Sequence, residues 1–360
     1  MRIKKALFLG TLCTAVSGMS LFAQAGVSYA KSAKETTEAS SEEATEVETE
    51  EETSEEVTYP ITIEHAFGET VIESKPERIA TIGWENQDTP LALGVAPVGV
   101  SAANYGLVTD NNLHLWTDEA FADLGVEKPV VFDDVDGLDF EQISDCNPDV
   151  ILAAYSGMTQ EDYDTLSQIA PVIPYKEKAW QTSWREQTIE NAEGMGMKPE
   201  GEKKVKEVED LIAEKLEEYP QLEGIPTAFC WISADDFSTF YVYLPTDPRA
   251  AYLLDLGFTL PESVQKLAGE TDDFNITVSR ENADQLNDIQ LMVVYGDEDL
   301  VKSLQEDKLM SQIPAIKNGA VALVDSTSAL AGASTPSILS IPYEIDEYLQ
   351  LLSDAAENIK

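Results

Sequence analysis

Histidine, cysteine and positive charge are the scarcest features of this sequence of 360 residues. With only two histidines, His65 and His114, and three cysteines, a zinc or manganese site built from several such ligands is not expected. Cys13 lies in an N-terminal apolar segment, while Cys146 and Cys230 stand far apart in apolar contexts. We therefore expect Cys146 and Cys230 to be two buried, unreacted thiols rather than a disulfide.

Basic residues are outnumbered throughout: 67 acidic residues stand against 23 basic ones, a formal net charge of −44. With the 11 glutamates and five basic residues that precede residue 58 set aside, 56 acidic and 18 basic residues remain, a net charge of −38. Such a surface repels phosphate backbones and anionic lipids. Neither nucleic acid nor an anionic membrane face is therefore expected as a partner.

Sequence motifs of the common enzyme classes are also missing. The chain has no P-loop, no dinucleotide-binding glycine motif and no HExxH. The stretch "GASTP" at residues 332–336 is not a nucleophile elbow, because Pro336 takes the place of the second glycine. Carboxylates are so numerous that no pair can be assigned to acid-base catalysis. We do not expect an enzyme.

Residues 1–30 are typical of a signal peptide. The segment begins with "MRIKK", continues through a mostly apolar run, and offers cleavage after Ala25 or Ala30. A lipid anchor at Cys13 is not expected, because Leu12 stands where lipoprotein processing requires a small residue. An uncleaved anchor remains an alternative, since the apolar run is only slightly shorter than a spanning helix.

Residues 31–57 contain 11 glutamates, many serines and threonines, and no aromatic residue. This composition cannot bury enough apolar surface to fold. We expect a disordered, self-repelling acidic tether between the signal peptide and the folded part.

An internal repeat relates two stretches of the folded part. "EQISDCNPDVILAAY", Glu141 to Tyr155, aligns without gaps with "ENADQLNDIQLMVVY", Glu281 to Tyr295. Each copy predicts a short helix that begins near Ser or Asp, then a turn, then a buried strand that ends in tyrosine. Two copies of one unit favour two similar lobes.

The remaining pattern alternates short apolar strands with helical or loop segments, which indicates mainly parallel sheets. Apolar residues recur at helical spacing through residues 202–216, and Pro220 ends the run. The predicted fold is α/β: two Rossmann-like lobes joined by a single long helix, with a ligand cleft between them. The boundaries are 58–199 for the first lobe, 200–219 for the helix and 220–360 for the second lobe. The strands are expected in residues 78–84, 96–100, 149–155, 171–175, 227–232, 289–295 and 320–325.

Several motifs carry a resemblance. The stretch "YPITIEHAFGETVIESKPERIATIGW", followed by "NPDVILAAYSGMTQEDYDTLSQIAPVI" and "WREQ", resembles the iron-siderophore substrate-binding proteins of ABC importers from residue 59 onward. The resemblance implies that the ligand lies between the lobes at the C-terminal ends of the strands, where open α/β sheets also bind ligands. It further implies that Glu141 and Glu281, one on each lobe, pair with arginines of the permease subunits. From position alone, both could instead be solvated glutamates favoured by a helix dipole.

Polar and aromatic residues gather at the predicted strand ends and are candidates for the cleft. Aromatic residues at strand ends belong to the core as often as to a ligand site, so their accumulation matters more than any one of them. Arg249 is the basic residue best suited to an anionic chelate, with pairing to Asp247 as the equally weighted alternative. Arg78 and Arg185 are expected to be structural. The ligand-binding candidates are Trp84, Asn86, Asn104, Tyr105, Tyr155, Trp180, Tyr241, Tyr243, Arg249 and Tyr295.

The expected ligand is an Fe(III)-siderophore complex, and no resident cofactor or directly bound metal is expected. Because positive charge is scarce, a neutral or cationic, hydroxamate-like chelate fits at least as well as an anionic one. Two alternatives stay open: a heme- or cobalamin-binding protein of the same fold, and an exported sensory or adhesive module without transport function. We expect a monomer.

Overall fold

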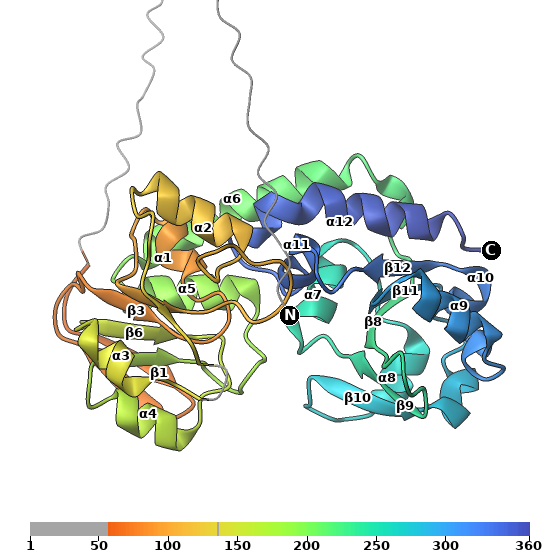
Figure 1. Ribbon diagram of the computed structural model, residues 1–360, viewed down its shortest axis with the longest axis horizontal. Helices are drawn as coiled ribbons and strands as arrows, with labels where there is room; N and C mark the ends of the chain where they lie inside the picture. Colours follow the sequence, from red (N-terminus) through yellow and green to blue (C-terminus); the bar gives the residue numbers. More distant parts are fainter. Residues whose placement is uncertain (1–56, 135–136) are drawn as a thin grey trace, which may run out of the picture. The chain divides into compact units, whose positions relative to one another are not determined.

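The computed structural model describes residues 57–134 and 137–360. The predictions of a signal peptide, of its cleavage and of the state of Cys13 lie outside the described residues, as does all of the acidic tether except Val57. The described part consists of two α/β lobes, one on each side of Figure 1. No helix among the described residues combines the length and the apolar character needed to span a membrane.

The N-terminal lobe is built on a five-stranded, fully parallel sheet in the order β5-β4-β3-β6-β7. Its central strands are buried on both faces, which explains their uninterrupted apolar sequences. An antiparallel hairpin, β1 (Ile61–His65) with β2 (Gly68–Ile72), packs beside this sheet. The strands are β3 (Ile79–Thr81), β4 (Gly99–Ser101), β5 (Val131–Phe132), β6 (Val150–Ala153) and β7 (Val172–Pro174), and the helices are α1 (Asp88–Ala92), α2 (Leu115–Asp123), α3 (Phe140–Asp145), α4 (Gln160–Leu166) and α5 (Trp184–Gly194).

The C-terminal lobe has a five-stranded sheet in the order β10-β9-β8-β11-β12. Strands β8, β11 and β12 are parallel. Strand β9 runs antiparallel to β8, because β8 turns directly into β9 without a crossover helix, and β10 pairs antiparallel with β9. The strands are β8 (Thr227–Trp231), β9 (Thr239–Tyr243), β10 (Asn275–Ser279), β11 (Leu291–Tyr295) and β12 (Val321–Val324). The helices are η1 (Pro220–Leu222), α7 (Pro248–Asp255), α8 (Glu262–Ala268), η2 (Arg280–Gln285), α9 (Glu298–Glu306), η3 (Met310–Gln312) and α10 (Pro314–Asn318).

The sequence repeat has a structural counterpart in these two sheets. Strand β6 stands between β3 and β7 in one lobe, and β11 stands between β8 and β12 in the other, all parallel. Each of the two strands follows a short helix, α3 or η2, whose first turn carries the repeated glutamate. The predicted fold of two α/β lobes with mainly parallel sheets is confirmed.

Helix α6 (Lys198–Leu216) carries the chain from the first lobe to the second and lies beside α12 (Ser340–Ala356) in Figure 1. Its apolar stripe, Val205, Val208 and Ile212, packs into the same core cluster as α12. The chain returns toward the first lobe through α11 (Ala329–Ala333), just before α12 begins. The lobes are therefore joined by the covalent helix and also by non-covalent contacts of the segment 334–340.

The two cysteines and the two arginines predicted to be structural are all in the described part of the chain. Cys146 and Cys230 are buried free thiols, as expected. Arg78 donates from Nε and Nη2 to the carbonyls of Asn147 and Cys146, so it anchors the turn before β6. Arg185, on α5, pairs with Glu209 of α6 and with Asp255 of α7, at N–O distances of 2.6 and 2.7 Å. Both arginines hold elements together, as expected for structural residues.

Candidate functional site

A cavity of about 380 Å³ lies between the lobes, and most of its wall is aromatic. Because the C-terminal ends of parallel strands meet at one edge of each sheet, residues that follow β3 and β6 face residues at the ends of β8, β9 and β11. The first lobe contributes Trp84, Tyr105, Tyr155 and Trp180, and the second contributes Trp231, Tyr243, Arg249, Phe274, Tyr295 and Thr335.

The aromatic rings form a packed floor and an open rim. Tyr105 meets Tyr295 of the other lobe edge to face, with ring centres 5.3 Å apart, and Tyr155 meets Trp180 in the same manner at 5.3 Å. Tyr155 and Tyr295 are buried, whereas Trp180 and Trp231 are 39% and 41% exposed. A ligand that enters the cleft would therefore meet the faces of exposed tryptophans above a floor of buried tyrosines.

Trp180 is held in an unusual backbone conformation, with φ of +62°. Its indole lies over Gly157, where a Cβ atom would come within 2.6 Å of Trp180 Nε1. Glycine at position 157 therefore leaves the space that the indole occupies. Strain at a cleft residue of this kind is typical of positions held for a ligand.

Arg249 lies at the start of α7 and makes two interactions at once. Its Nε and Nη2 donate to Asp247 Oδ1 and Oδ2 at 2.8 and 2.6 Å, and its guanidinium carbon lies 4.1 Å from the centre of the Tyr243 ring. Asp247 also caps α7 by accepting from the backbone N–H of Arg249. Arg249 thus lines the cleft cavity and is at the same time paired with Asp247.

The tyrosine hydroxyls of the cavity stay protonated at neutral pH. Burial raises the pKa of Tyr243 to about 12 against the opposing charge of Arg249, and burial likewise raises the pKa of Tyr105, Tyr155 and Tyr295. With Asp247 neutralising Arg249, this wall offers hydrogen-bond donors without net positive charge.

A second cavity, of about 280 Å³, lies within the N-terminal lobe and shares Trp84 and Trp180 with the first. We call it the N-lobe cavity. Its wall is more polar than that of the cleft: it includes Glu85, Gln87, Ser101, Asn104, His114, Asp134 and Asp162. Ser101 donates to Asp134 at 2.5 Å.

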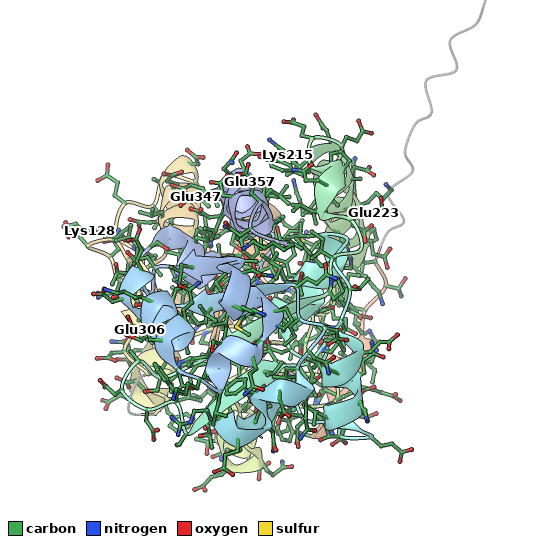
Figure 2. The ribbon with its side chains drawn as sticks, turned by 90° about the vertical axis from the view of Figure 1, so that its right-hand side faces the viewer. Lys128, Lys215, Glu223, Glu306, Glu347 and Glu357 are labelled. Carbon is green, nitrogen blue, oxygen red and sulfur yellow. The ribbon has the colours of Figure 1, made fainter. Side chains whose placement is uncertain are left out.

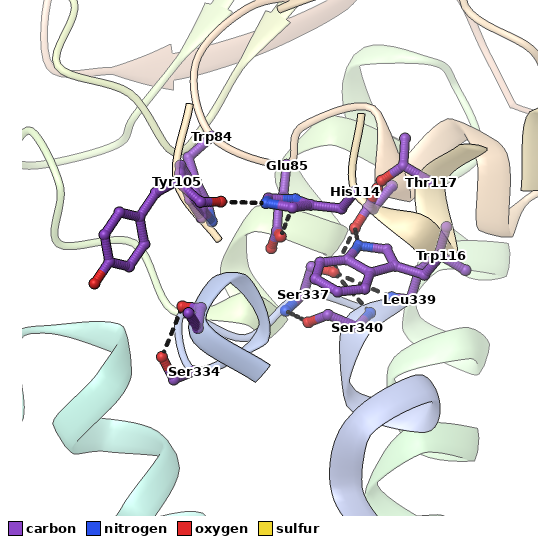
Figure 3. Close-up of polar contacts among 12 residues, drawn as sticks. Trp84, Glu85, Tyr105, His114, Trp116, Thr117, Ser334, Ser337, Leu339 and Ser340 are labelled. Atoms are coloured by element: carbon purple, nitrogen blue, oxygen red, sulfur yellow. Dashed lines mark hydrogen bonds and ion pairs between the residues drawn. The ribbon is translucent and has the colours of Figure 1, made fainter. Parts of the chain in front are cut away.

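A buried polar cluster lies next to this cavity, where segment 334–340 meets the first lobe (Figure 3). Asp88 accepts from Trp116 Nε1 at 2.9 Å, from Thr117 Oγ1 at 2.8 Å and, across the lobes, from Ser337 Oγ at 2.5 Å. Burial, with the nearby Glu85 charge second, raises the pKa of Asp88 to about 7 despite these donors. The cluster fastens the two lobes on the closed side of the cleft.

His114 belongs to the same region. Its Nε2 is 3.0 Å from the carbonyl of Tyr105, and its Nδ1 is 3.1 Å from Glu85 Oε1 (Figure 3). Burial lowers the pKa of His114 and raises that of Glu85 well above its usual range. His114 is thus held between the carbonyl of Tyr105 and one carboxyl oxygen of Glu85.

The open side of the cleft is spanned by contacts between two loops. Lys178 of the first lobe pairs with the carboxylate of Asp272 in the second, and Gln181 Nε2 donates to the Asp272 carbonyl at 3.0 Å. Both ionic side chains are largely exposed, so the pair adds little to stability. These contacts connect the lobes beside Trp180 and Phe274.

The candidate residues named from the sequence fall into three groups: those that line the cleft cavity, one that lines the N-lobe cavity, and two that line neither. Asn104 lines the N-lobe cavity. Tyr241 on β9 lines neither cavity: it is exposed, and its ring centre lies 5.5 Å from that of Trp231. Asn86 lines neither cavity: it is fully buried, donates to the carbonyls of Ile82 and Tyr155, and accepts from Tyr155 N at 3.1 Å. Those that line the cleft cavity are Trp84, Tyr105, Tyr155, Trp180, Tyr243, Arg249 and Tyr295.

Sequence reasoning missed Trp231, Phe274 and Thr335. Trp231 could have been found, since it ends a predicted apolar strand whose C-terminal edge faces the cleft. Phe274 and Thr335 come from loops, and no periodic pattern indicates where a loop residue points.

Glu141 and Glu281 are exposed residues in the first turns of α3 and η2. Each of these short helices is capped by the residue two positions earlier: Asp139 accepts from Gln142 N, and Ser279 accepts from Glu281 N. The two glutamates thus occupy equivalent positions on the two lobes.

The chain has clear relatives among known proteins. The sequence pattern of the family described as periplasmic binding protein matches residues 79–327. The crystal structure of PiaA from Streptococcus pneumoniae TIGR4 in complex with ferrichrome is 47% identical, covers 83% of this chain and 100% of its own, and superposes with a TM-score of 0.80. The petrobactin-binding protein YclQ of Bacillus subtilis is 24% identical over 305 residues, covering 81% of this chain and 88% of YclQ. The Fe(3+) dicitrate-binding periplasmic protein FecB of Escherichia coli is 26% identical over 281 residues, covering 74% and 86%.

Proposed function

Because the chain belongs to the periplasmic binding protein family, we propose that it captures a ferric siderophore outside the cytoplasm and delivers it to the permease of an ABC importer. The observation that carries this proposal is the aromatic cavity between the two lobes, with Arg249 and Asp247 in its wall. Its volume of about 380 Å³ falls in the range of small-molecule sites.

The chemistry of the cavity favours a neutral chelate. Aromatic faces bind apolar and polarisable ligand surfaces, while the tyrosine hydroxyls and the outer guanidinium N–H groups of Arg249 can donate to chelate oxygens. The paired Asp247 cancels the charge of Arg249, so a highly anionic complex gains little here. A ferric trihydroxamate is neutral, because three singly charged hydroxamates balance Fe(III). PiaA, whose crystal structure holds ferrichrome, a chelate of this class, supports the same choice at 47% identity.

Delivery to the permease is the second part of the proposal. Glu141 and Glu281 lie at equivalent, exposed positions of the two lobes, so they can engage two equivalent permease subunits. Each such ion pair at a rim is worth about 0.2 to 1 kcal/mol and mainly sets the register of the complex. The predicted signal peptide supports export of the protein before it meets its chelate.

Heme is a weaker candidate ligand. Neither histidine is available as an axial ligand, since His65 contacts Thr70 Oγ1 at 2.9 Å, His114 is held by Tyr105 and Glu85, and both are at least 90% buried. An exported sensory or adhesive module would share the fold, but such a module would not need matched glutamates on both lobes.

The proposal is tested by titrating the purified protein with ferric hydroxamates, ferric catecholates, heme and cobalamin while tryptophan fluorescence is recorded. Trp84, Trp180 and Trp231 line the cavity, so a bound ferric chelate is expected to quench their emission. Quenching by a ferric hydroxamate at submicromolar concentration supports the proposal. Stronger quenching by heme or cobalamin would replace the siderophore assignment, and no quenching by any ferric chelate would remove it.

A further inference from the structure

The N-lobe cavity has hydrogen-bond acceptors that no described residue satisfies. Glu85 Oε2 and Gln87 Oε1 accept no hydrogen bond, although both residues line the cavity and are at most 4% exposed. Buried polar oxygens are nearly always paired in folded proteins. The occupant of this cavity is therefore expected to supply donors.

The charges of the lining residues also favour an occupant that donates hydrogen bonds. The carboxyl groups in the wall are those of Glu85, Asp134 and Asp162, while no lysine or arginine belongs to the described lining. His114 is the one basic side chain there, and burial lowers its pKa, which favours the neutral ring. Glu85 Oε1 lies 3.1 Å from Nδ1 of this ring, whereas Glu85 Oε2 has no hydrogen-bond partner in the described part of the chain. A cation that donates hydrogen bonds would provide a partner for this second oxygen.

The N-lobe cavity adjoins the cleft, since Trp84 and Trp180 line both. Its volume of about 280 Å³ holds several water-sized groups, at about 30 Å³ for each water molecule in the liquid. A short aminoalkyl chain attached to a chelate in the cleft therefore has room to extend past the two tryptophans.

We propose that the N-lobe cavity is a second subsite of the ligand site, which binds a positively charged, hydrogen-bond-donating arm of the iron chelate, such as a primary ammonium group. Glu85 and Gln87 accept from the arm, while the iron centre rests against the aromatic wall of the cleft. This inference rests on the proposed function and narrows its substrate to chelates that carry such an arm.

The test compares two probes with the same iron centre. One is a linear ferric trihydroxamate with a free primary ammonium arm, and the other is the same chelate with that amine acetylated. Calorimetric titration of the purified full-length protein should show the ammonium form binding about tenfold more tightly, as expected for a charge-assisted hydrogen bond. Because this comparison uses the unaltered protein, it does not depend on any variant that must fold.

Two substitutions sharpen the test. Glu85→Gln keeps the shape of the side chain and should bring the affinity ratio of the two probes close to one. Glu190→Gln is the matched control, because Glu190 also has an unpartnered buried oxygen but lines a different cavity, which shares no residue with the N-lobe cavity. The Glu190→Gln protein should keep the tenfold ratio.

The outcomes separate the subsite from the proposed function. If both probes bind with equal submicromolar affinity, the chelate site stands and the ammonium subsite is wrong. If a preference for the ammonium probe survives Glu85→Gln undiminished, the assignment of the arm to the N-lobe cavity is wrong. If neither probe binds, both the subsite and capture of ferric hydroxamates are overturned.

Discussion

Arg249 holds both carboxylate oxygens of Asp247 while its guanidinium lies over the ring of Tyr243. Asp247 is fully buried, and the Arg249 side chain is 20% exposed toward the cleft. The pair thus fixes a planar donor group in the wall of the cavity and cancels its charge. Such a wall suits the oxygens of a neutral chelate.

Replacing Arg249 alone should damage both stability and binding. Arg249→Gln would leave Asp247 as a buried, unpaired charge, which costs about 3 to 5 kcal/mol of unfolding free energy. The double variant Asp247→Asn with Arg249→Gln removes both charges and keeps an oxygen that can cap α7. Its stability should return to within about 1.5 kcal/mol of the unaltered protein, while affinity for a ferric trihydroxamate stays at least tenfold weaker.

Urea unfolding and calorimetric titration of the three proteins check this prediction. Recovery of affinity together with stability in the double variant would show that Arg249 serves only to neutralise Asp247.

Charge reversal at the two repeated glutamates should separate uptake from binding. Glu141→Arg with Glu281→Arg should abolish chelate uptake by cells, since like charges then meet at the permease, but leave the dissociation constant of the purified protein unchanged. Glu306→Arg with Glu347→Arg is the control: both side chains are exposed in the view of Figure 2, and the change in net charge is the same. Uptake of radioactive iron chelate by cells that express each variant is the measurement. Equal uptake by the test and control pairs would contradict the docking role.

Removing the hydroxyl of Ser337 should weaken the joint between the lobes. Ser337→Ala takes one of three donors from Asp88 and should cost about 1 to 3 kcal/mol of unfolding free energy. In the unaltered protein the hydrogen bond from Ser337 stabilises the charged form of Asp88, whose pKa burial raises to about 7. Loss of this bond should therefore raise the pKa of Asp88 further. Because a raised folded-state pKa lowers stability as pH rises through it, the deficit should be larger at pH 8 than at pH 5.

Thermal or urea unfolding at both pH values tests this, with Ser353→Ala as a control on the exposed side of α12. A deficit that is the same at pH 5 and pH 8 would mean that Asp88 is not the group affected.

Glu190 should make stability depend on pH in the same direction. Burial, reinforced by Glu186, raises its pKa to about 8, while the unfolded chain has the ordinary value of 4.5. The folded protein then retains a proton that the unfolded chain loses, so stability falls as pH rises from 4.5 to 8, at about 1.4 kcal/mol per unit. Glu190→Gln should remove this dependence and be the more stable protein at pH 8. Urea unfolding of both proteins at pH 5 and pH 8 measures this effect. A stability gain of Glu190→Gln over the unaltered protein that is smaller at pH 8 than at pH 5 would refute the prediction.

Much of the fold could be predicted because its central strands are buried on both faces. Runs such as those of β6 and β11 are apolar without interruption, and the repeat of Glu141 and Tyr155 at Glu281 and Tyr295 indicates two similar lobes. Strand β10 was not predicted, since it is an edge strand whose residues are mostly half-buried. The second contact between the lobes was also missed, because Asp88 and Ser337 are 249 residues apart.

The aromatic wall of the cleft could be predicted from the rule that parallel strands end at one edge, but the orientation of single side chains could not. Asn86 follows β3 closely, as a cleft residue would, yet its side chain is fully buried. The residue before it, Glu85, has a φ of +54°, a backbone conformation that the sequence does not indicate. Tyr241 and Tyr243 lie on the same face of β9, but only Tyr243, at the end of the strand, lines the cavity, and the residue spacing does not show where along this face the cavity ends.

The most direct test of the account is a calorimetric titration of the purified protein with a neutral ferric trihydroxamate. We expect one chelate per chain, a dissociation constant below 1 µM, and competition between any two chelates that share the cleft. Absence of binding at micromolar concentration would contradict the assignment of the cleft as a siderophore site.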